Sequence, residues 1–178
     1  NGQEEKRFDY LVNATYSGLN LVSKWFGFPI EPLRFDLYEL VVLHAPLDQI
    51  CLTIIDGPFT SLIGTGVENT FLLSHIHQSM LKSVITEDGL PPDWGEFQSN
   101  SANMVAEASR YIPALKQAQI IHSVYATRAV NAYAHDFDAR PTVVRNHGFG
   151  CWSVLGGKII TCVTNAREIA RDIQACES

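Results

Sequence analysis

Residues 33–77 read LRFDLYELVVLHAPLDQICLTIIDGPFTSLIGTGVENTFLLSHIH, and this stretch contains four apolar segments of the kind that form β-strands. The segments are separated by HAPLDQ, DGP and GTGVEN, which are short and rich in polar residues, proline and glycine. Adjacent parallel strands need a connection of roughly a dozen residues or more, so breaks this short predict antiparallel neighbours. The four expected strands are Leu33–Ala45, Cys51–Asp56, Phe59–Ile63 and Thr70–His77.

The remainder of the chain adds other strands and a few helices. Apolar residues spaced by three and four predict amphipathic helices near residues 100–112 and 161–175, and a shorter helix is expected at 19–26. The first expected strand has no earlier strand with which to pair. The sequence therefore predicts an α+β fold with a mostly antiparallel sheet, whose further strands are Phe8–Ala14, Gln119–Tyr125, Thr142–Asn146 and Cys151–Leu155.

Composition excludes several classes of protein. Hydrophobic residues make up 46% of the 178 residues and charged residues 18%, which is a globular composition. The net charge of -6, with no block of lysine and arginine, argues against nucleic-acid binding. No apolar run approaches the roughly 20 residues that span a bilayer. Four separated cysteines without a CxxC pair predict reduced, buried thiols and a cytoplasmic protein: Cys51, Cys151, Cys162 and Cys176.

The pair His75 and His77 is a candidate metal site, because residues two apart on a strand point to the same face. The other ligands of a zinc or iron site are not in place, since Glu87 lies ten residues beyond His77 and past the expected end of the strand. The preferred interpretation is a polar strand face, and no metal is predicted.

Two further motifs have ordinary structural interpretations. Gly64-Thr65-Gly66 begins like a phosphate-binding loop, but Asn69 stands where a third glycine is needed, so a hairpin turn is predicted. Cys151 and His147 are close in sequence, which alone does not make a thiol nucleophile, and a buried thiol is preferred.

Four cations fall within 31 residues, at Arg128, Arg140, Arg145 and Lys158. An arginine binds a carboxylate or phosphate through two parallel hydrogen bonds, so such a cluster suits an anionic ligand. Each cation also has a simpler interpretation as a solvated strand end or a salt-bridge partner.

The segment CWSVLGGKIIT, residues 151–161, places two glycines and a lysine where a strand gives way to a helix. Glycine lets a ligand approach the backbone closely, and a helix N-terminus with a lysine favours negative charge. The alternative is a plain strand–helix turn whose lysine extends into solvent.

Two parts of the sequence resemble a known family. Residues 9–15, DYLVNAT, are similar to the strand that precedes the substrate domain in D-amino-acid-oxidase-like FAD-dependent oxidoreductases. Residues 140–144, RPTVV, and 152–161, WSVLGGKIIT, resemble the segment by which that family returns to its FAD-binding domain. The most similar pattern is that of the glycerol-3-phosphate dehydrogenase branch, and the resemblance covers Phe8–Asn20 and Gln119–Ile173.

This resemblance implies FAD as the cofactor and assigns residues to the site. Gly156, Gly157, Lys158, Ile159, Ile160 and Thr161 would approach the flavin ring, and Arg128, Arg140 and Lys158 would bind the anionic substrate. It divides the chain into a remnant of the FAD-binding domain (1–27), an antiparallel substrate-binding domain (28–140) and the return segment with the C-terminal helix (141–178).

The family's GxGxxG motif is absent from these residues. We therefore expect the C-terminal part of a flavoenzyme, inactive alone, whose partner is the missing N-terminal FAD-binding half.

The function predicted on this basis is oxidation of a small anionic substrate, either an amino acid or amine or else a hydroxy acid or polyol phosphate. One alternative is a non-enzymatic β-sheet module that binds a small anion or a partner. A third interpretation is a zinc or iron β-domain that uses His75 and His77. The electron acceptor and any homo-oligomer are left open by the sequence.

Overall fold

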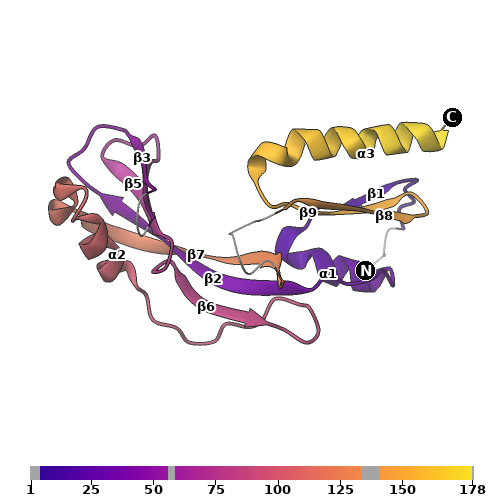
Figure 1. Ribbon diagram of the computed structural model, residues 1–178, viewed down its shortest axis with the longest axis horizontal. Coiled ribbons are helices and arrows are strands. Elements are labelled where there is room, and N and C mark those ends of the chain that lie inside the picture. Colours follow the sequence, from indigo (N-terminus) through magenta and orange to yellow (C-terminus); the bar gives the residue numbers. More distant parts are fainter. Residues whose placement is uncertain (1–4, 56–58, 134–140, 178) are drawn as a thin grey trace. The chain divides into compact units, whose positions relative to one another are not determined.

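The protein is described by a computed structural model that covers residues 5–55, 59–133 and 141–177 (Figure 1). It separates into two units, each described by itself. Unit 1 comprises Asn1–Arg34, Ile85–Pro91 and Ala129–Ser178, and unit 2 comprises Phe35–Val84 and Pro92–Arg128. The mixture of helices with mostly antiparallel strands confirms the predicted α+β class.

Unit 2 is built on an antiparallel sheet with the strand order β3-β4-β5-β2-β6, and β7 also pairs with β2. The predicted hairpins are confirmed, since β3 pairs with β4 and β4 with β5, both antiparallel. The GTGVEN segment is the turn between β4 and β5, as expected. The strands are β2 (Leu33–His44), β3 (Cys51–Ile54), β4 (Thr60–Gly64), β5 (Thr70–His75), β6 (Met80–Ile85) and β7 (Gln119–Asn131).

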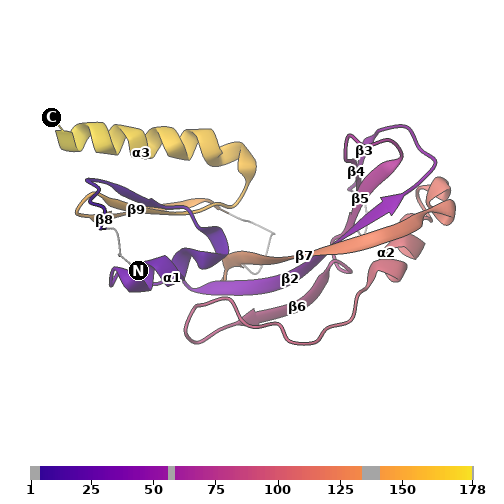
Figure 2. The same cartoon turned by 180° about the vertical axis from the view of Figure 1, so that it is seen from behind.

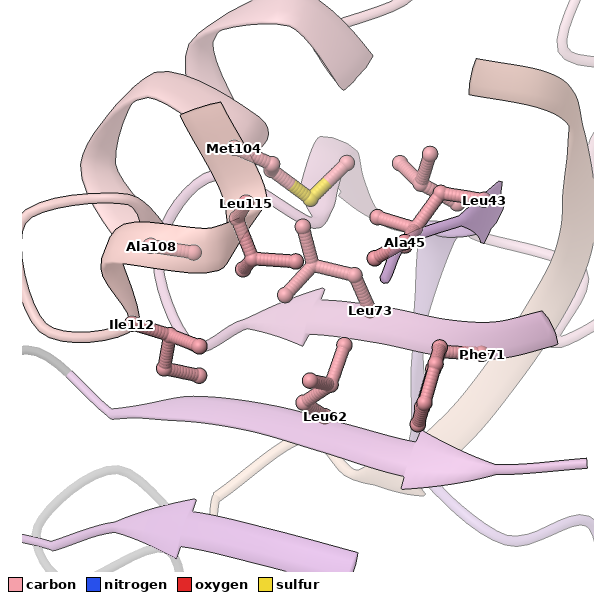
Figure 3. Packing of buried hydrophobic residues seen from close by; sticks show 10 residues of the cluster. Leu43, Ala45, Leu62, Phe71, Leu73, Met104, Ala108, Ile112 and Leu115 are labelled. Carbon is pink, nitrogen blue, oxygen red and sulfur yellow. The ribbon is translucent and has the colours of Figure 1, made fainter. Parts of the chain in front are cut away.

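The core of unit 2 lies between this sheet and two short helices, α2 (Ser101–Ala108) and the 3-10 helix η2 (Pro113–Gln117). Figure 3 shows Met104 and Leu115 from these helices packed against Leu73 of β5. Burying one such side chain stabilises the fold by roughly 1.5–3 kcal/mol. The α-helix is shorter than the predicted 100–112, because a turn precedes Pro113, which has no N–H to donate.

A buried carboxylate holds the start of α2. Glu39 of β2 is fully buried, and its Oε2 accepts the backbone N–H of Asn100 at 2.7 Å. Its Oε1 accepts the hydroxyls of Ser99 at 2.6 Å and Ser123 at 2.5 Å. The negative charge therefore meets neutral donors at the positive end of a helix, where it is stabilised.

Unit 1 contains a three-stranded sheet in the order β1-β9-β8. Its strands are β1 (Leu11–Asn13), β8 (Val143–Gly148) and β9 (Cys151–Leu155), and the last two form an antiparallel hairpin. The first strand, which had no evident partner in the sequence, pairs in parallel with β9.

Two helices cover opposite faces of this sheet. Figures 1 and 2 show α1 (Leu19–Trp25) on one face and α3 (Cys162–Glu177) on the other. Trp152 of β9 is almost fully buried and donates its indole N–H to Asp172 of α3 at 3.1 Å. This bond ties the C-terminal helix to the sheet.

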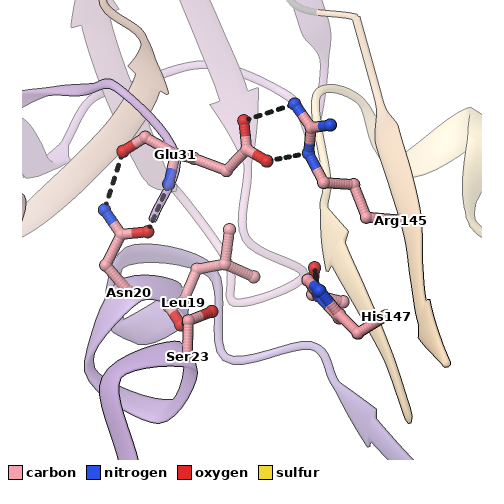
Figure 4. Close-up of polar contacts among 7 residues, drawn as sticks. Leu19, Asn20, Ser23, Glu31, Arg145 and His147 are labelled. Carbon is pink, nitrogen blue, oxygen red and sulfur yellow. Dashed lines mark hydrogen bonds and ion pairs between the residues drawn. The ribbon is translucent and has the colours of Figure 1, made fainter. Parts of the chain in front are cut away.

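Polar contacts fix the other face of unit 1 (Figure 4). The buried amide of Asn20 donates to the carbonyls of Glu31 and Gly89, each at 2.8 Å, and accepts the N–H of Glu31. The Glu31 carboxylate pairs with Arg145 through Nε and through Nη2, the latter at 3.1 Å. These hydrogen bonds raise the pKa of Arg145 above its ordinary value.

The structure corrects one expectation and adds a strand. The cysteines are free thiols, but Cys51, Cys162 and Cys176 are exposed and Cys151 is half-buried, so the expected burial is wrong. β6 was not predicted.

Among the residues described, no helix combines the length and the apolar character that crossing a bilayer requires.

Candidate functional site

Unit 1 contains a cavity of about 460 Å³ between one face of its sheet and helix α3. Val12 and Ala14 contribute the β1 side, Val154 contributes the β9 side, and Ala166 and Ile169 face them from α3. The cavity is of the size and apolar character typical of small-molecule sites. The other lining residues are Tyr16, Gly156, Gly157, Lys158, Ile159, Thr161, Cys162 and Asn165.

The glycine turn at the end of β9 forms one wall of this cavity. A Cβ built on Gly156 meets no heavy atom of the described chain within 4 Å, and its φ lies outside the left-handed region. Neither packing nor backbone conformation therefore requires a glycine there. A glycine that faces open space in a cavity wall is explained by a ligand that approaches the backbone closely.

Two threonines hold the turn in place. The N–H of Gly157 donates to Thr142 Oγ1 at 3.1 Å, and that hydroxyl lies 2.7 Å from Thr161 Oγ1. The Thr161 hydroxyl donates to the carbonyl of Lys158 at 2.8 Å. The turn is thus fixed from both the residue that precedes β8 and the 3-10 helix η3 (Ile159–Thr161) before any ligand binds.

The electrostatics of this wall favour negative charge. α3 has 16 residues, and its first turn contains no acidic residue. The first N–H groups of a helix have no partners within the helix, and its dipole is positive at that end. Lys158 lies beside them in the cavity wall and is solvent-exposed.

Most residues of the predicted flavin wall line this one cavity. Gly156, Gly157, Lys158, Ile159 and Thr161 do so, whereas Ile160 is 82% exposed and is not part of the lining. Sequence reasoning missed the contributions of β1, of Tyr16 and of α3 beyond residue 161. Their apolar periodicity indicates only a buried face, not a cavity.

Of the predicted substrate arginines, Arg128 is among the described residues, and it does not line this cavity. Arg128 belongs to unit 2, where its Nη2 contacts Asp36 Oδ2 at 2.9 Å and its guanidinium lies 5.0 Å from the centre of the Tyr38 ring. Asp36 is fully buried and also accepts the Ser83 hydroxyl at 2.6 Å. Arg140 lies outside the described residues.

The two histidines do not lie on one strand, as the candidate metal site supposed. β5 ends at His75, so His77 is in the following turn. His75 Nδ1 accepts the N–H groups of His77 at 3.3 Å and Gln78 at 3.2 Å. Burial, with a smaller contribution from His77, lowers the pKa of His75 below 6.5. The described residues contain no group of three or more potential metal ligands.

The pair Cys151 and His147 also has other contacts. The Cys151 thiol lies 3.6 Å from the carbonyl of Phe149, and His147 Nε2 lies 2.8 Å from the Ser153 hydroxyl. The His147 ring stacks on Phe28 with a centroid distance of 4.3 Å. Both side chains are therefore engaged in packing of the β8–β9 hairpin.

Comparisons with known proteins give a consistent picture at the level of the fold. No protein-family model and no curated protein sequence matches the chain. An FAD-dependent oxidoreductase from Pseudomonas aeruginosa superposes with a TM-score of 0.61 over 95% of the chain, at 15% identity. Glycine oxidase from Geobacillus kaustophilus gives a TM-score of 0.53 over 85% of the chain, at 16% identity. Iminodiacetate oxidase from Chelativorans sp. BNC1 gives 0.57 over 84%, at 10% identity.

The chain spans 46%, 37% and 37% of the lengths of these three structures, respectively. It therefore shares the fold of one part of FAD-dependent oxidoreductases, which agrees with the resemblance noted in its sequence.

Proposed function

We propose that this chain is the substrate-binding and partial flavin-binding portion of an FAD-dependent oxidoreductase. The observation that carries the proposal is the open space in front of Gly156, in the wall of an apolar cavity beside a helix N-terminus. FAD, when bound, would supply the group that accepts a hydride from the substrate.

The residues present fit a flavin ring. A planar, largely apolar ring suits a cavity whose broad walls are Val12, Val154 and Ile169. Negative charge develops on a flavin when it is reduced, and Lys158 with the first N–H groups after it would stabilise that charge. The cavity would enclose the ring system and not the whole dinucleotide.

The remaining part of the flavin site would come from residues beyond these 178. The similar solved structures are at least twice as long as the matched region, which supports this division. Residues 1–27 and 141–178 would then belong to the FAD-binding domain and residues 28–140 to the substrate domain. Within that family, we propose that the chain is most similar to the glycerol-3-phosphate dehydrogenase branch.

The substrate would be a small anion that carries a hydride-donating carbon, either an amino acid or amine or else a hydroxy acid or polyol phosphate. Arg128 would bind its carboxylate or phosphate, with Arg140 assisting. Asp36 contacts Nε and Nη2 of Arg128, at 3.3 and 2.9 Å, through a single oxygen. The guanidinium has five N–H donors, so the carboxylate contact does not exhaust its hydrogen-bonding capacity.

Titration of the 178-residue chain with lumiflavin, the flavin ring without its ribityl chain, tests the cofactor assignment. We expect saturable quenching of lumiflavin fluorescence by the wild-type chain. Gly156→Leu should weaken binding at least tenfold, about 1.4 kcal/mol, because its side chain occupies the cavity. Its melting temperature should match the wild type, because a Cβ at this position meets nothing.

Lys158→Ala is the electrostatic companion to that experiment. Lumiflavin should still bind, but the reduction potential of the bound ring should fall, because the reduced form loses a counter-charge. Absence of lumiflavin binding by the wild-type chain, with Gly156→Leu indistinguishable from it, would instead favour the non-enzymatic binding module.

In the intact enzyme, Arg128→Ala should raise KM for the anionic substrate by the loss of a paired contact worth roughly 2–5 kcal/mol. Arg128→Lys, which keeps the charge but loses the planar fork, should show an intermediate KM. A KM unchanged in both variants would remove Arg128 from the substrate site.

A further inference from the structure

Tyr16 has a backbone conformation that tyrosine rarely adopts. Its φ is 55°, and within the described chain only Asn69 and Phe149 are other non-glycine residues with positive φ. Asn69 lies in a hairpin turn, where asparagine tolerates this region, and Phe149 lies between two left-handed glycines. Tyr16 follows β1 at the start of the 3-10 helix η1 (Tyr16–Gly18), and neither explanation applies to it.

The conformation is imposed by the neighbours of Tyr16. Asn13 Oδ1 accepts the Thr15 hydroxyl at 2.8 Å and its N–H at 3.3 Å. Asn13 Nδ2 donates to the carbonyl of Leu19 at 2.9 Å, and the N–H of Gly18 donates to the carbonyl of Thr15 at 3.0 Å. These bonds fix the backbone on both sides of Tyr16 without using its side chain.

A glycine would adopt this backbone without strain, so a tyrosine here is a local cost to folding. The Tyr16 side chain is 37% exposed and lines the cavity together with Gly156 and Gly157. The same three residues also line a smaller neighbouring pocket. Tyr16 therefore lines the cavity in the neighbourhood of the glycine turn, and its partial exposure means that its ring gains little from burial.

We propose that Tyr16 is a ligand-contact residue whose ring packs against a planar heteroaromatic ligand in the cavity. The inference rests on the proposed flavin function and names the aromatic contact that completes it. A tyrosine supplies a large, rigid surface with two side-chain torsions, and aromatic rings attract one another beyond simple area burial. The strained backbone is then retained because it aims this ring at the ligand.

Three variants of the 178-residue chain test the proposal, each measured by lumiflavin titration and by thermal unfolding without ligand. Tyr16→Gly should keep or raise the melting temperature, because strain is relieved, yet weaken lumiflavin binding at least tenfold. Tyr16→Phe should bind within about threefold of the wild type, since stacking needs the ring and not the hydroxyl. Phe149→Gly is the matched control, because it relieves the same kind of strain at a side chain that is 96% exposed. It should leave binding unchanged.

The proposal is supported if Tyr16→Gly keeps or raises the melting temperature and weakens lumiflavin binding, while Phe149→Gly leaves lumiflavin binding unchanged. Equal lumiflavin affinity in the wild type and Tyr16→Gly would overturn it while leaving the flavin assignment intact. A lower melting temperature for Tyr16→Gly with unchanged affinity would make Tyr16 an ordinary packing residue. A wild-type chain that does not bind lumiflavin would overturn the flavin assignment and, with it, this inference.

Discussion

The two units contrast a closed apolar core in unit 2 with an open cavity in unit 1. In unit 2 the central cluster, including Leu62, Phe71 and Leu73, is fully buried between sheet and helices. In unit 1 the residues that follow the glycine turn are open to solvent, with Ile159 90% and Ile160 82% exposed. Both units expose some apolar side chains, for example Ile121 of unit 2 at 53%, but those that follow the glycine turn of unit 1 stand beside a cavity. The difference locates the surface at which a further molecule has most to contribute.

Matched truncations give the largest expected contrast. Leu73→Ala in unit 2 should lower the free energy of unfolding by about 2–5 kcal/mol, because it leaves a cavity in a close-packed core. Ile160→Ala in unit 1 should change it by no more than about 0.5 kcal/mol, because the side chain is already in water. Urea denaturation measures both. A large loss for Ile160→Ala would abolish the distinction between the units.

The ion pairs provide the next contrast. Arg128→Ala leaves the fully buried carboxylate of Asp36 without its cation, and we expect a loss of about 3–5 kcal/mol in unfolding free energy. Arg145→Ala removes a side chain that is 54% exposed, although the Glu31 carboxylate it leaves behind is 8% exposed, and solvent screening at Arg145 should keep the loss smaller, at about 1–3 kcal/mol. Chemical denaturation at low and high salt checks the order. Equal losses at both sites would show that water reaches Asp36 as readily as Glu31.

On its α1 side, unit 1 is held by buried hydrogen bonds. Asn20→Ala removes three buried hydrogen bonds of a fully buried amide, so its cost should reach about 2–3 kcal/mol. Leu21→Ala on the same helix, where the side chain is 41% exposed, is the control and should cost far less. If Asn20→Ala is nearly neutral by urea denaturation, unit 1 is loosely held on both faces.

The smallest predicted effect is a pH dependence of unit 2. Because the pKa of His75 is lowered by burial, the folded protein binds fewer protons than the unfolded chain just below pH 6.5. Stability should therefore fall as pH decreases from 6.5 toward the folded pKa, and level off below it. His75→Gln should flatten this part of the profile, as followed by urea midpoints between pH 7 and 5. An unchanged pH dependence of stability in His75→Gln would show that groups other than His75 cause it.

Sequence reasoning succeeded where the decisive contacts are local. Short breaks between strands predicted the β3–β4–β5 hairpins, and apolar spacing predicted the C-terminal helix. It failed for β6, where five of the six residues are exposed and the pattern MLKSVI has no regular alternation. Pairing with β2, set by tertiary contacts, makes this segment a strand.

For the site, the sequence indicated the chemistry of individual residues better than it indicated which residues lie next to one another in space. The Gly-Gly-Lys turn was identified because its residue types suit an anion or a close ligand. The role of Asp36 was not evident, because it precedes Arg128 by 92 residues. The left-handed conformation of Tyr16 has no local signature either, since tyrosine normally argues against it.

The parallel pairing of β1 with β9 has a consequence for how the chain is made. Leu11 of β1 lies opposite Cys151 of β9, so about 140 further residues must be synthesised after β1 before its partner strand exists. At the usual rate of roughly 5–20 residues per second, that delay lasts about 7 to 28 seconds. Unit 2 contains mostly short-range hairpins and emerges in the interval. Folding of this segment should therefore begin in unit 2, and the sheet of unit 1 should close only after β9 has been synthesised.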